Sequence, residues 1–132
     1  MNLIHRDLKP SNILFSEKDR LKLCDLGIAT ERMAKDSTQT VLTRTNIGTA
    51  LYMSPEQQSM FATYSSKTDV FSLGLILAEL CIVMTTIERS KIFNNYRAGK
   101  QNNLIIDDEM SEIVTMLTMT DPKSRPSCRE IL

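Results

Sequence analysis

The sequence predicts a mainly α-helical fold with one small β-hairpin near its N-terminus. Within residues 12–24, two short segments that favour strands surround a polar turn, which is typical of a hairpin. From residue 54 onward, capping sequences and apolar residues spaced three and four apart indicate helices. The length of 132 residues, with 42% hydrophobic and 24% charged residues, suits one globular domain or part of one.

The expected hairpin pairs a strand over residues 12–15 with a strand over residues 21–24. The second segment, LKLC, alternates apolar and polar residues, and SEKDR supplies the turn between the two. The following residues, 25–53, are polar, rich in threonine and without clear periodicity. A loop of that length inside a compact domain is usually functional or disordered.

Two helices are expected in the first half of the helical region. The sequence SPEQ at residues 54–57 is a capping box with proline at the first helical position. Residues 69–84 are apolar nearly all round, which predicts a central, buried helix. Their apolar run, LGLILAELCIVM, contains Glu79 and is too short to cross a bilayer.

Three more helices are expected towards the C-terminus. Residues 87–98 are expected to form an amphipathic helix that ends at Gly99. A spacing of three and four marks another helix, carried by Met110, Ile113, Val114 and Leu117. The sequence SCRE at residues 127–130 is a second capping box, and the chain ends at Leu132, within about one turn of it. The last helix is therefore expected to be truncated.

Charge and cysteine content exclude several classes of protein. Sixteen basic and sixteen acidic residues cancel, so net charge gives no reason to expect a nucleic-acid partner. Three widely spaced cysteines and a single histidine, His5, suit neither a zinc site nor a disulfide framework. We expect buried, reduced thiols in a cytosolic or nuclear protein. No signal segment opens the chain, so a cytoplasmic location is expected and no membrane segment.

The sequence HRDLKPSN at residues 5–12 carries the groups that phosphoryl transfer to a hydroxyl needs. Asp7 supplies a carboxylate that can orient the hydroxyl and accept its proton. Lys9 supplies a cation near the transferred group, and Asn12 supplies a carbonyl oxygen for magnesium. Magnesium prefers a few hard oxygen ligands together with phosphate. A second carboxylate should therefore lie nearby, and Asp25 in DLG is the candidate.

Taken together in this order and spacing, the motifs resemble the C-terminal lobe of a eukaryotic protein kinase. HRDLKPSN at residues 5–12 matches the catalytic loop, DLG matches D-F-G, and SPE matches A-P-E. The resemblance covers essentially the whole chain, as a partial kinase domain of residues 1–132. It implies an activation segment over residues 25–56, a helical subdomain over residues 57–132, and ATP with Mg²⁺ as cofactors.

The resemblance also implies regulatory residues. Arg6 of the catalytic loop is expected to receive a phosphothreonine of the activation loop through bidentate contacts. Thr43 or Thr45 in VLTRTNIGT would be that phosphosite, and Thr49 is expected to hydrogen-bond around the base and the lysine. Lys9 lies two residues after the aspartate, and this position and Thr49 resemble the pattern of serine/threonine kinases rather than that of tyrosine kinases.

Three further residues are expected to be structural. Asp69 in DVFSLG resembles the aspartate that holds the backbone of the catalytic loop, and it also suits the N-terminal end of a helix. Glu56 of SPE and Arg125 of DPKSRP are expected to form a buried ion pair. Two positions depart from the family pattern, because Leu26 replaces the phenylalanine of D-F-G and Ser54 replaces the alanine of A-P-E.

A narrower resemblance runs through GTALYMSPEQ, DVFSLGLILAEL and TTIERSKIFNNYRAGK. These segments are similar to kinases of the α subunit of translation initiation factor 2. The similarity implies that protein as substrate, a role in translation regulation and stress response, and a possible kinase dimer. It places substrate docking on residues 88–97, with Glu88, Arg89 and Arg97 as the contacts. Another stress-type serine/threonine kinase is the alternative.

Four residues precede His5, and the sequence contains four glycines and no G-x-G-x-x-G motif. The N-terminal lobe that would bind the nucleotide is therefore expected to be absent, and the chain alone to be an inactive fragment of a kinase. A rival expectation is a non-catalytic lobe that binds a substrate or a sister kinase. A small-molecule phosphotransferase would share the Asp-to-Asn spacing, but it would explain neither SPEQ nor the threonine-rich loop.

Overall fold

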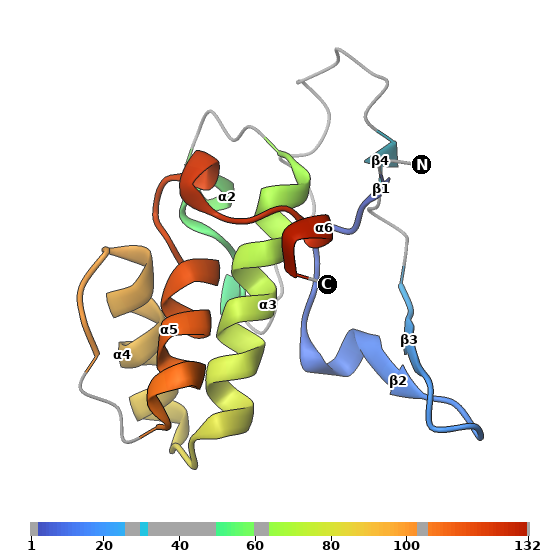
Figure 1. Ribbon diagram of the computed structural model, residues 1–132, viewed down its shortest axis with the longest axis horizontal. Helices are drawn as coiled ribbons and strands as arrows, with labels where there is room; N and C mark the ends of the chain where they lie inside the picture. The colour runs from blue at the N-terminus through green and yellow to red at the C-terminus, as the bar shows by residue number, and fades with distance from the viewer. Residues whose placement is uncertain (1–2, 26–29, 32–49, 60–63, 103–105, 132) are drawn as a thin grey trace.

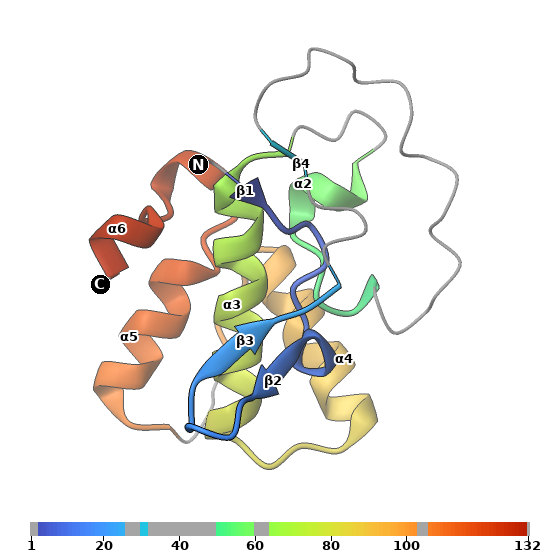
Figure 2. The same ribbon diagram turned by 90° about the vertical axis from the view of Figure 1, so that its right-hand side faces the viewer.

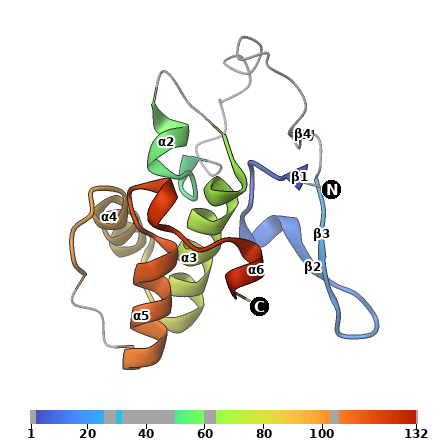
Figure 3. The same ribbon diagram turned by 45° about the horizontal axis from the view of Figure 1, so that its top comes forward.

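The computed structural model describes residues 3–25, 30–31, 50–59, 64–102 and 106–131. Helix α3, Ser66–Cys81, runs through the middle of the molecule, and helix α5, Asp108–Leu117, packs against it. Helix α4, Thr86–Arg97, lies on the same side of α3 as α5 (Figure 1). The short strands near the N-terminus lie on the opposite side of α3 (Figures 1 and 3).

The predicted hairpin is present and slightly shorter than expected. Strand β2, Ile13–Phe15, pairs antiparallel with strand β3, Leu21–Leu23, and Leu14 faces Lys22 in the register. Asn12 belongs to the preceding 3₁₀ turn η1, Pro10–Asn12, rather than to the strand. The proline at the first position of that turn has the fixed φ that a helical turn requires. Figure 2 shows the hairpin face-on, in front of α3.

A second strand pair was not expected from the sequence. Strand β1, Leu3–Ile4, pairs antiparallel with strand β4, Thr30–Glu31. Strand β4 lies inside the stretch that was expected to be one irregular loop, so part of that expectation is wrong. Two residues are too few to produce a visible alternation, which explains why the pattern did not predict them.

Helix α3 begins and ends three residues earlier than residues 69–84, the range predicted from apolar content. Ser65 caps the helix, because its side chain accepts a hydrogen bond from the Lys67 amide at 3.2 Å. The helix is central, but it is not covered on every side in the described structure, since Leu73 and Leu80 are 37% and 78% exposed. Apolar content alone therefore overestimated how completely this helix is buried.

The remaining helices lie within one or two residues of the predicted ranges. Helix α4 is capped by Thr85, and Gly99 follows it with φ of +66°, a conformation that glycine adopts without strain. In both predicted capping boxes a side-chain oxygen accepts from the cap amide: Gln57 accepts from Ser54 at 3.0 Å and Glu130 accepts from Ser127 at 2.6 Å. The short helices are α2, Pro55–Gln58, α6, Cys128–Ile131, and the 3₁₀ turn η3, Pro122–Ser124.

The hydrophobic core joins the catalytic-loop segment to the helices. Its buried members come from four parts of the chain and are Leu8, Tyr52, Phe71, Leu75, Ile76 and Phe93. The rings of Tyr52 and Phe93 meet edge to face, with centroids 5.6 Å apart. Because Leu8 lies between Asp7 and Lys9, its burial anchors the residues predicted to be catalytic.

All three cysteines are free thiols. Cys24 and Cys81 are half-buried, but Cys128 is exposed, so the expectation of buried thiols is wrong for Cys128. Within the described ranges, no helix has the length and the apolar content needed to cross a membrane.

Candidate active site

The catalytic-loop residues predicted from HRDLKPSN converge on one carboxylate. Lys9 Nζ donates to Asp7 Oδ2 at 2.7 Å. Asn12 Nδ2 donates to the Asp7 backbone carbonyl at 2.8 Å and approaches Oδ2 at 3.3 Å. The turn η1 brings Asn12 back towards Asp7, so three residues separated along the chain share one small site. A carboxylate held in this way can accept a proton from a hydroxyl, beside a cation that balances nearby phosphate charge.

Asp69, at the start of α3, fixes the backbone that leads into this site. Its two carboxylate oxygens accept hydrogen bonds from the amides of His5 at 2.8 Å and Arg6 at 2.9 Å. Burial raises the pKa of Asp69, and the two amide hydrogen bonds offset only part of that effect. The contact predicted for Asp69, with the catalytic-loop backbone, is therefore present.

Hydrogen bonds through Cys24 connect the end of strand β3 to the same site. The Cys24 amide donates to the Asn12 carbonyl, and His5 Nε2 donates to the Cys24 carbonyl, each at 2.9 Å. Asp25 follows directly, exposed and with φ of +60°. The hairpin thus returns the chain to the catalytic loop, as its short length predicted.

The donor set at this site suits magnesium rather than zinc. Both side-chain contacts of Asn12 use Nδ2, so Oδ1 is the oxygen that can face a cation. Asp25 adds an exposed carboxylate. Among the described residues, no group of three or more His, Cys, Asp and Glu side chains could enclose a metal ion. Magnesium needs no such enclosure, because it is held by one or two protein oxygens together with phosphates and waters.

The predicted ion pair between Glu56 and Arg125 is present and buried. Arg125 Nη1 and Nη2 donate to the two Glu56 oxygens at 2.7 and 2.9 Å, and Arg125 is 1% exposed. Arg125 also donates from Nε to the Met119 carbonyl at 2.6 Å, and its guanidinium lies 4.7 Å from the Phe71 ring centroid. Burial raises the pKa of Glu56, but the contacts with Arg125, together with hydrogen bonds from the Glu56 amide and Ser54, outweigh burial and lower the net pKa. The pair joins α2 to the C-terminal part of the chain.

The predicted regulatory residues are only partly described. Thr43, Thr45 and Thr49 lie outside the described residues, and so does Leu26. Arg6 is described: its guanidinium carbon lies 4.7 Å from the centroid of the Tyr64 ring, and its Nε is buried without a hydrogen-bond partner in the described structure. The role of Arg6 as a phosphothreonine receiver therefore stays a prediction.

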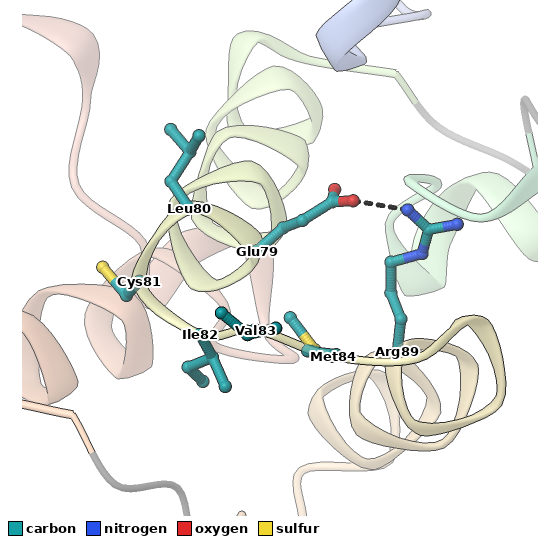
Figure 4. A pocket seen from close by; sticks show the side chains of 7 residues that line it. All are labelled: Glu79, Leu80, Cys81, Ile82, Val83, Met84 and Arg89. Atoms are coloured by element: carbon teal, nitrogen blue, oxygen red, sulfur yellow. Dashed lines mark hydrogen bonds and ion pairs between the residues drawn. The ribbon is translucent and has the colours of Figure 1, made fainter.

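The predicted docking residues all make contacts inside the molecule. Glu88 accepts from the Thr85 amide at 2.8 Å and hydroxyl at 2.7 Å, which caps α4 and lowers the pKa of Glu88. Arg89 forms an ion pair with Glu79 at the edge of a surface pocket of about 340 Å³ (Figure 4). Glu88 is exposed, whereas Arg89 is half-buried. Substrate docking by this face stays a prediction.

Arg97 ties α4 to the segment that precedes α2. Its Nε donates to the Met53 carbonyl at 2.7 Å, and its Nη2 donates to the Leu51 carbonyl. Burial lowers the pKa of Arg97. The same segment is held from α3, because Ser72 Oγ donates to the Tyr52 carbonyl at 2.8 Å and Tyr52 OH donates to Glu79 at 2.5 Å. The family resemblance implied only a docking role for Arg97.

One residue near the site was missed by sequence reasoning. Gln57 of α2 is 3% exposed, and its Nε2 donates to the Arg6 carbonyl at 2.8 Å. The motif SPEQ indicated Gln57 only as part of a helix cap. A polar residue buried next to a conformationally restricted loop is a signal that becomes visible only once the fold is known.

Comparison with known proteins identifies the family. A model of the protein kinase domain matches residues 1–132. The chain is 40% identical to the interferon-induced, double-stranded RNA-activated protein kinase of Rattus norvegicus over 131 residues, which cover 98% of this chain and 25% of that protein. It is 37% identical to the serine/threonine-protein kinase Nek2 of Homo sapiens over 135 residues, covering 98% of this chain and 29% of that protein.

A third relative is the eukaryotic translation initiation factor 2-alpha kinase 3 of Rattus norvegicus, 39% identical over 141 residues, covering 98% of this chain and 13% of that protein. The chain belongs to the protein kinase family, and its mainly helical fold with one hairpin agrees with the C-terminal lobe of that family. It spans about a quarter or less of the length of the first and third of these relatives. Its similarity extends to serine/threonine kinases of two kinds, those that act on initiation factor 2 and Nek2.

Proposed function

We propose that this chain supplies the acid–base and metal-binding residues of a serine/threonine protein kinase that transfers the γ-phosphate of ATP to a protein hydroxyl. The observation that carries the proposal is the Asp7 carboxylate, which contacts both Lys9 and Asn12 in a loop held by Asp69. This arrangement fixes the carboxylate before a substrate arrives. Preorganised groups contribute most to catalysis by positioning and electrostatics.

In this mechanism, Asp7 orients the substrate hydroxyl and accepts its proton. Lys9 balances negative charge next to the transferred group, and its contact with Asp7 keeps the two groups together. Asn12 Oδ1 and the Asp25 carboxylate would hold Mg²⁺, which neutralises phosphate charge when it is bound. Asp69 and His5 act on the backbone and on the neighbouring strand, so they position the site without touching the reacting atoms.

The proposed substrate is the α subunit of translation initiation factor 2. Support comes from the resemblance of GTALYMSPEQ and TTIERSKIFNNYRAGK to kinases of that factor, and from a relative whose name states this activity. The similarity to Nek2 supports the alternative, another serine/threonine kinase with a different protein substrate. Since these 132 residues contain no G-x-G-x-x-G motif, we propose that the chain alone transfers no phosphate.

A second candidate function is a non-catalytic lobe that binds a substrate or a sister kinase. It is favoured by exposed apolar side chains around the end of α3 and the start of α4, where Leu80, Val83 and Ile87 are 78%, 103% and 83% exposed. Exposed apolar residues that gather in one place often mark an interaction surface.

The test of the proposed function is a hybrid kinase. This chain replaces the matching 131-residue segment of the rat double-stranded RNA-activated kinase, and phosphate transfer from radiolabelled ATP to the initiation factor subunit is measured. We expect the hybrid to phosphorylate the subunit and the isolated chain to be inactive. A folded hybrid that transfers no phosphate to any protein, while the isolated chain binds the subunit saturably, would replace this proposal by the non-catalytic one.

A further inference from the structure

We propose that Gln57 is a positioning residue of the catalytic loop, because its side-chain amide holds the peptide group between Arg6 and Asp7. Gln57 lies on α2, 51 positions away from Arg6, and is 3% exposed. Its Nε2 donates to the Arg6 carbonyl at 2.8 Å, while its Oε1 accepts from the Ser54 amide at 3.0 Å. One buried amide therefore joins the start of α2 to the residue before the proposed base.

Arg6 needs such support because of its backbone conformation. Its φ is +69°, a region that residues with a side chain rarely occupy. Its amide donates to Asp69 Oδ1 at 2.9 Å, and its carbonyl accepts from Gln57. Both polar backbone groups of Arg6 are thus held by side chains from two different helices, α3 and α2. Conformations of this kind persist where the surroundings determine them strongly.

The carbonyl contact acts directly on Asp7. The Arg6 carbonyl and the Asp7 amide belong to one planar peptide group, so fixing the carbonyl fixes the direction in which the chain enters Asp7. The Asp7 carboxylate must also meet Lys9 Nζ at 2.7 Å and Asn12 Nδ2 at 3.3 Å. A rotation of that peptide plane would move the carboxylate relative to both partners.

The two contacts of Gln57 serve separable purposes. A capping box is completed equally well by glutamate or glutamine, because only an oxygen is needed to accept from the cap amide. The Nε2 donor is therefore not required by the helix, and its partner is the catalytic loop. The neighbouring Glu56 is bound to Arg125, which holds α2 in place behind Gln57.

This separation defines the experiment, which is carried out on the 132-residue chain by NMR. Gln57→Glu keeps the oxygen for the cap and removes the donor to Arg6. Gln58→Glu makes the same charge change at an exposed neighbour on α2 and is the control. We expect the Arg6 and Asp7 amides to exchange about tenfold faster in Gln57→Glu, with the Arg6 carbonyl resonance shifted, and to be unchanged in Gln58→Glu.

Three results would overturn the inference. The first is unchanged exchange at Arg6 and Asp7 in folded Gln57→Glu, and the second is an equal change in Gln58→Glu. A carboxylate at a buried position can unfold the chain. A second test therefore uses the unsubstituted protein. A scalar coupling across the hydrogen bond between Gln57 Nε2 and the Arg6 carbonyl is expected there, and its absence in a spectrum that resolves both atoms would equally contradict the proposal.

The link to Asp7 chemistry rests on the proposed function and has its own readout. In the hybrid kinase, Gln57→Glu is expected to lower kcat by roughly 10- to 100-fold and to leave the KM for ATP unchanged. An unchanged kcat would show that Gln57 does not position the base. If the unsubstituted hybrid is inactive, the proposed function fails, while the NMR result on Gln57 still decides whether the hydrogen bond exists.

Discussion

At the residue scale, two half-buried carboxylates organise the molecule in different ways. Asp69 accepts from the amides of His5 and Arg6 and so holds backbone, whereas Glu56 binds the guanidinium of Arg125 and so holds another side chain. The pKa of Asp69 is raised because the effect of burial exceeds the opposing effect of its hydrogen bonds. The pKa of Glu56 is lowered because Arg125, with hydrogen bonds from the Glu56 amide and Ser54, outweighs the effect of burial. Their contributions to stability therefore depend on pH with opposite sign.

Glu56→Gln isolates the pH dependence of the ion pair. A carboxylate whose folded pKa is depressed contributes stability that is present above its unfolded pKa and is lost as the pH falls through the folded pKa. The unfolded value is close to the ordinary 4.5. We therefore expect the difference in melting temperature between the unsubstituted chain and Glu56→Gln to be constant near neutral pH and to shrink below pH 4.5.

Thermal unfolding between pH 3 and pH 7 measures this difference, and the exposed Glu112→Gln on α5 is the matched control. A difference that grows on acidification would contradict the lowered pKa of Glu56. Arg125→Met should destabilise the chain at neutral pH by about 3–5 kcal/mol, because it leaves the Glu56 charge without its partner.

At the element scale, close contact between α3 and α5 depends on Gly74. An added Cβ would lie 2.7 Å from Thr118 Cγ2 and 2.8 Å from Leu117 Cβ, which is closer than carbon atoms approach. Alanine is favoured over glycine within a helix by about 1 kcal/mol, whereas overpacking costs about 1–3 kcal/mol. The cost of overpacking should exceed the gain in helix propensity, because the two facing atoms are near the backbone of α5 and have little room to move.

We therefore expect Gly74→Ala to destabilise the chain by about 1 kcal/mol, measured by urea denaturation. The double variant Gly74→Ala with Thr118→Ser removes one of the two facing carbons and keeps the hydroxyl that donates to the Val114 carbonyl at 2.7 Å. It should recover part of the loss. If Gly74→Ala were more stable than the unsubstituted chain, α5 would have moved aside and the gain in helix propensity would exceed the cost of overpacking.

Helix α4 and the segment of residues 50–53 form a second contact between elements. Arg97 donates to carbonyls of Met53 and Leu51, and burial of its guanidinium lowers its pKa. Arg97→Met keeps most of the volume and removes the donors. It should cost about 1–3 kcal/mol and speed hydrogen exchange at residues 51–53, with the exposed Lys100→Met as control. Exchange that rises only within α4 would show that Arg97 supports the helix alone.

Local signals in the sequence predicted these elements well. Capping boxes at Ser54 and Ser127 and the spacing of apolar residues in α5 led to the correct helices. The start of α3 was missed by three residues, because apolar content was weighed more heavily than the cap at Ser65. Strands of two residues, such as β1 and β4, leave too little pattern to be recognised.

At the scale of the whole molecule, three elements hold the catalytic loop from different directions. Asp69 of α3 holds its amides, Gln57 of α2 holds a carbonyl, and Cys24 after β3 accepts from His5 and donates to Asn12. The motifs gave the chemical identity of Asp7, Lys9 and Asn12 and their order along the chain. They did not predict the contact of Gln57 with the catalytic loop or the contacts of Arg97 within the molecule. A contact between residues 44 or more positions apart produces no periodic pattern in the sequence.

The measurement that most directly tests the assignment of Asp7 as the base is the turnover of the hybrid kinase carrying Asp7→Asn. An amide keeps the size and one acceptor oxygen but cannot take the substrate proton, so kcat should fall by about 10²–10⁴-fold. Asp19→Asn, at an exposed hairpin position with φ of +52° that asparagine tolerates, should leave kcat unchanged. A folded Asp7→Asn hybrid with kcat near that of the unsubstituted hybrid would contradict the assignment.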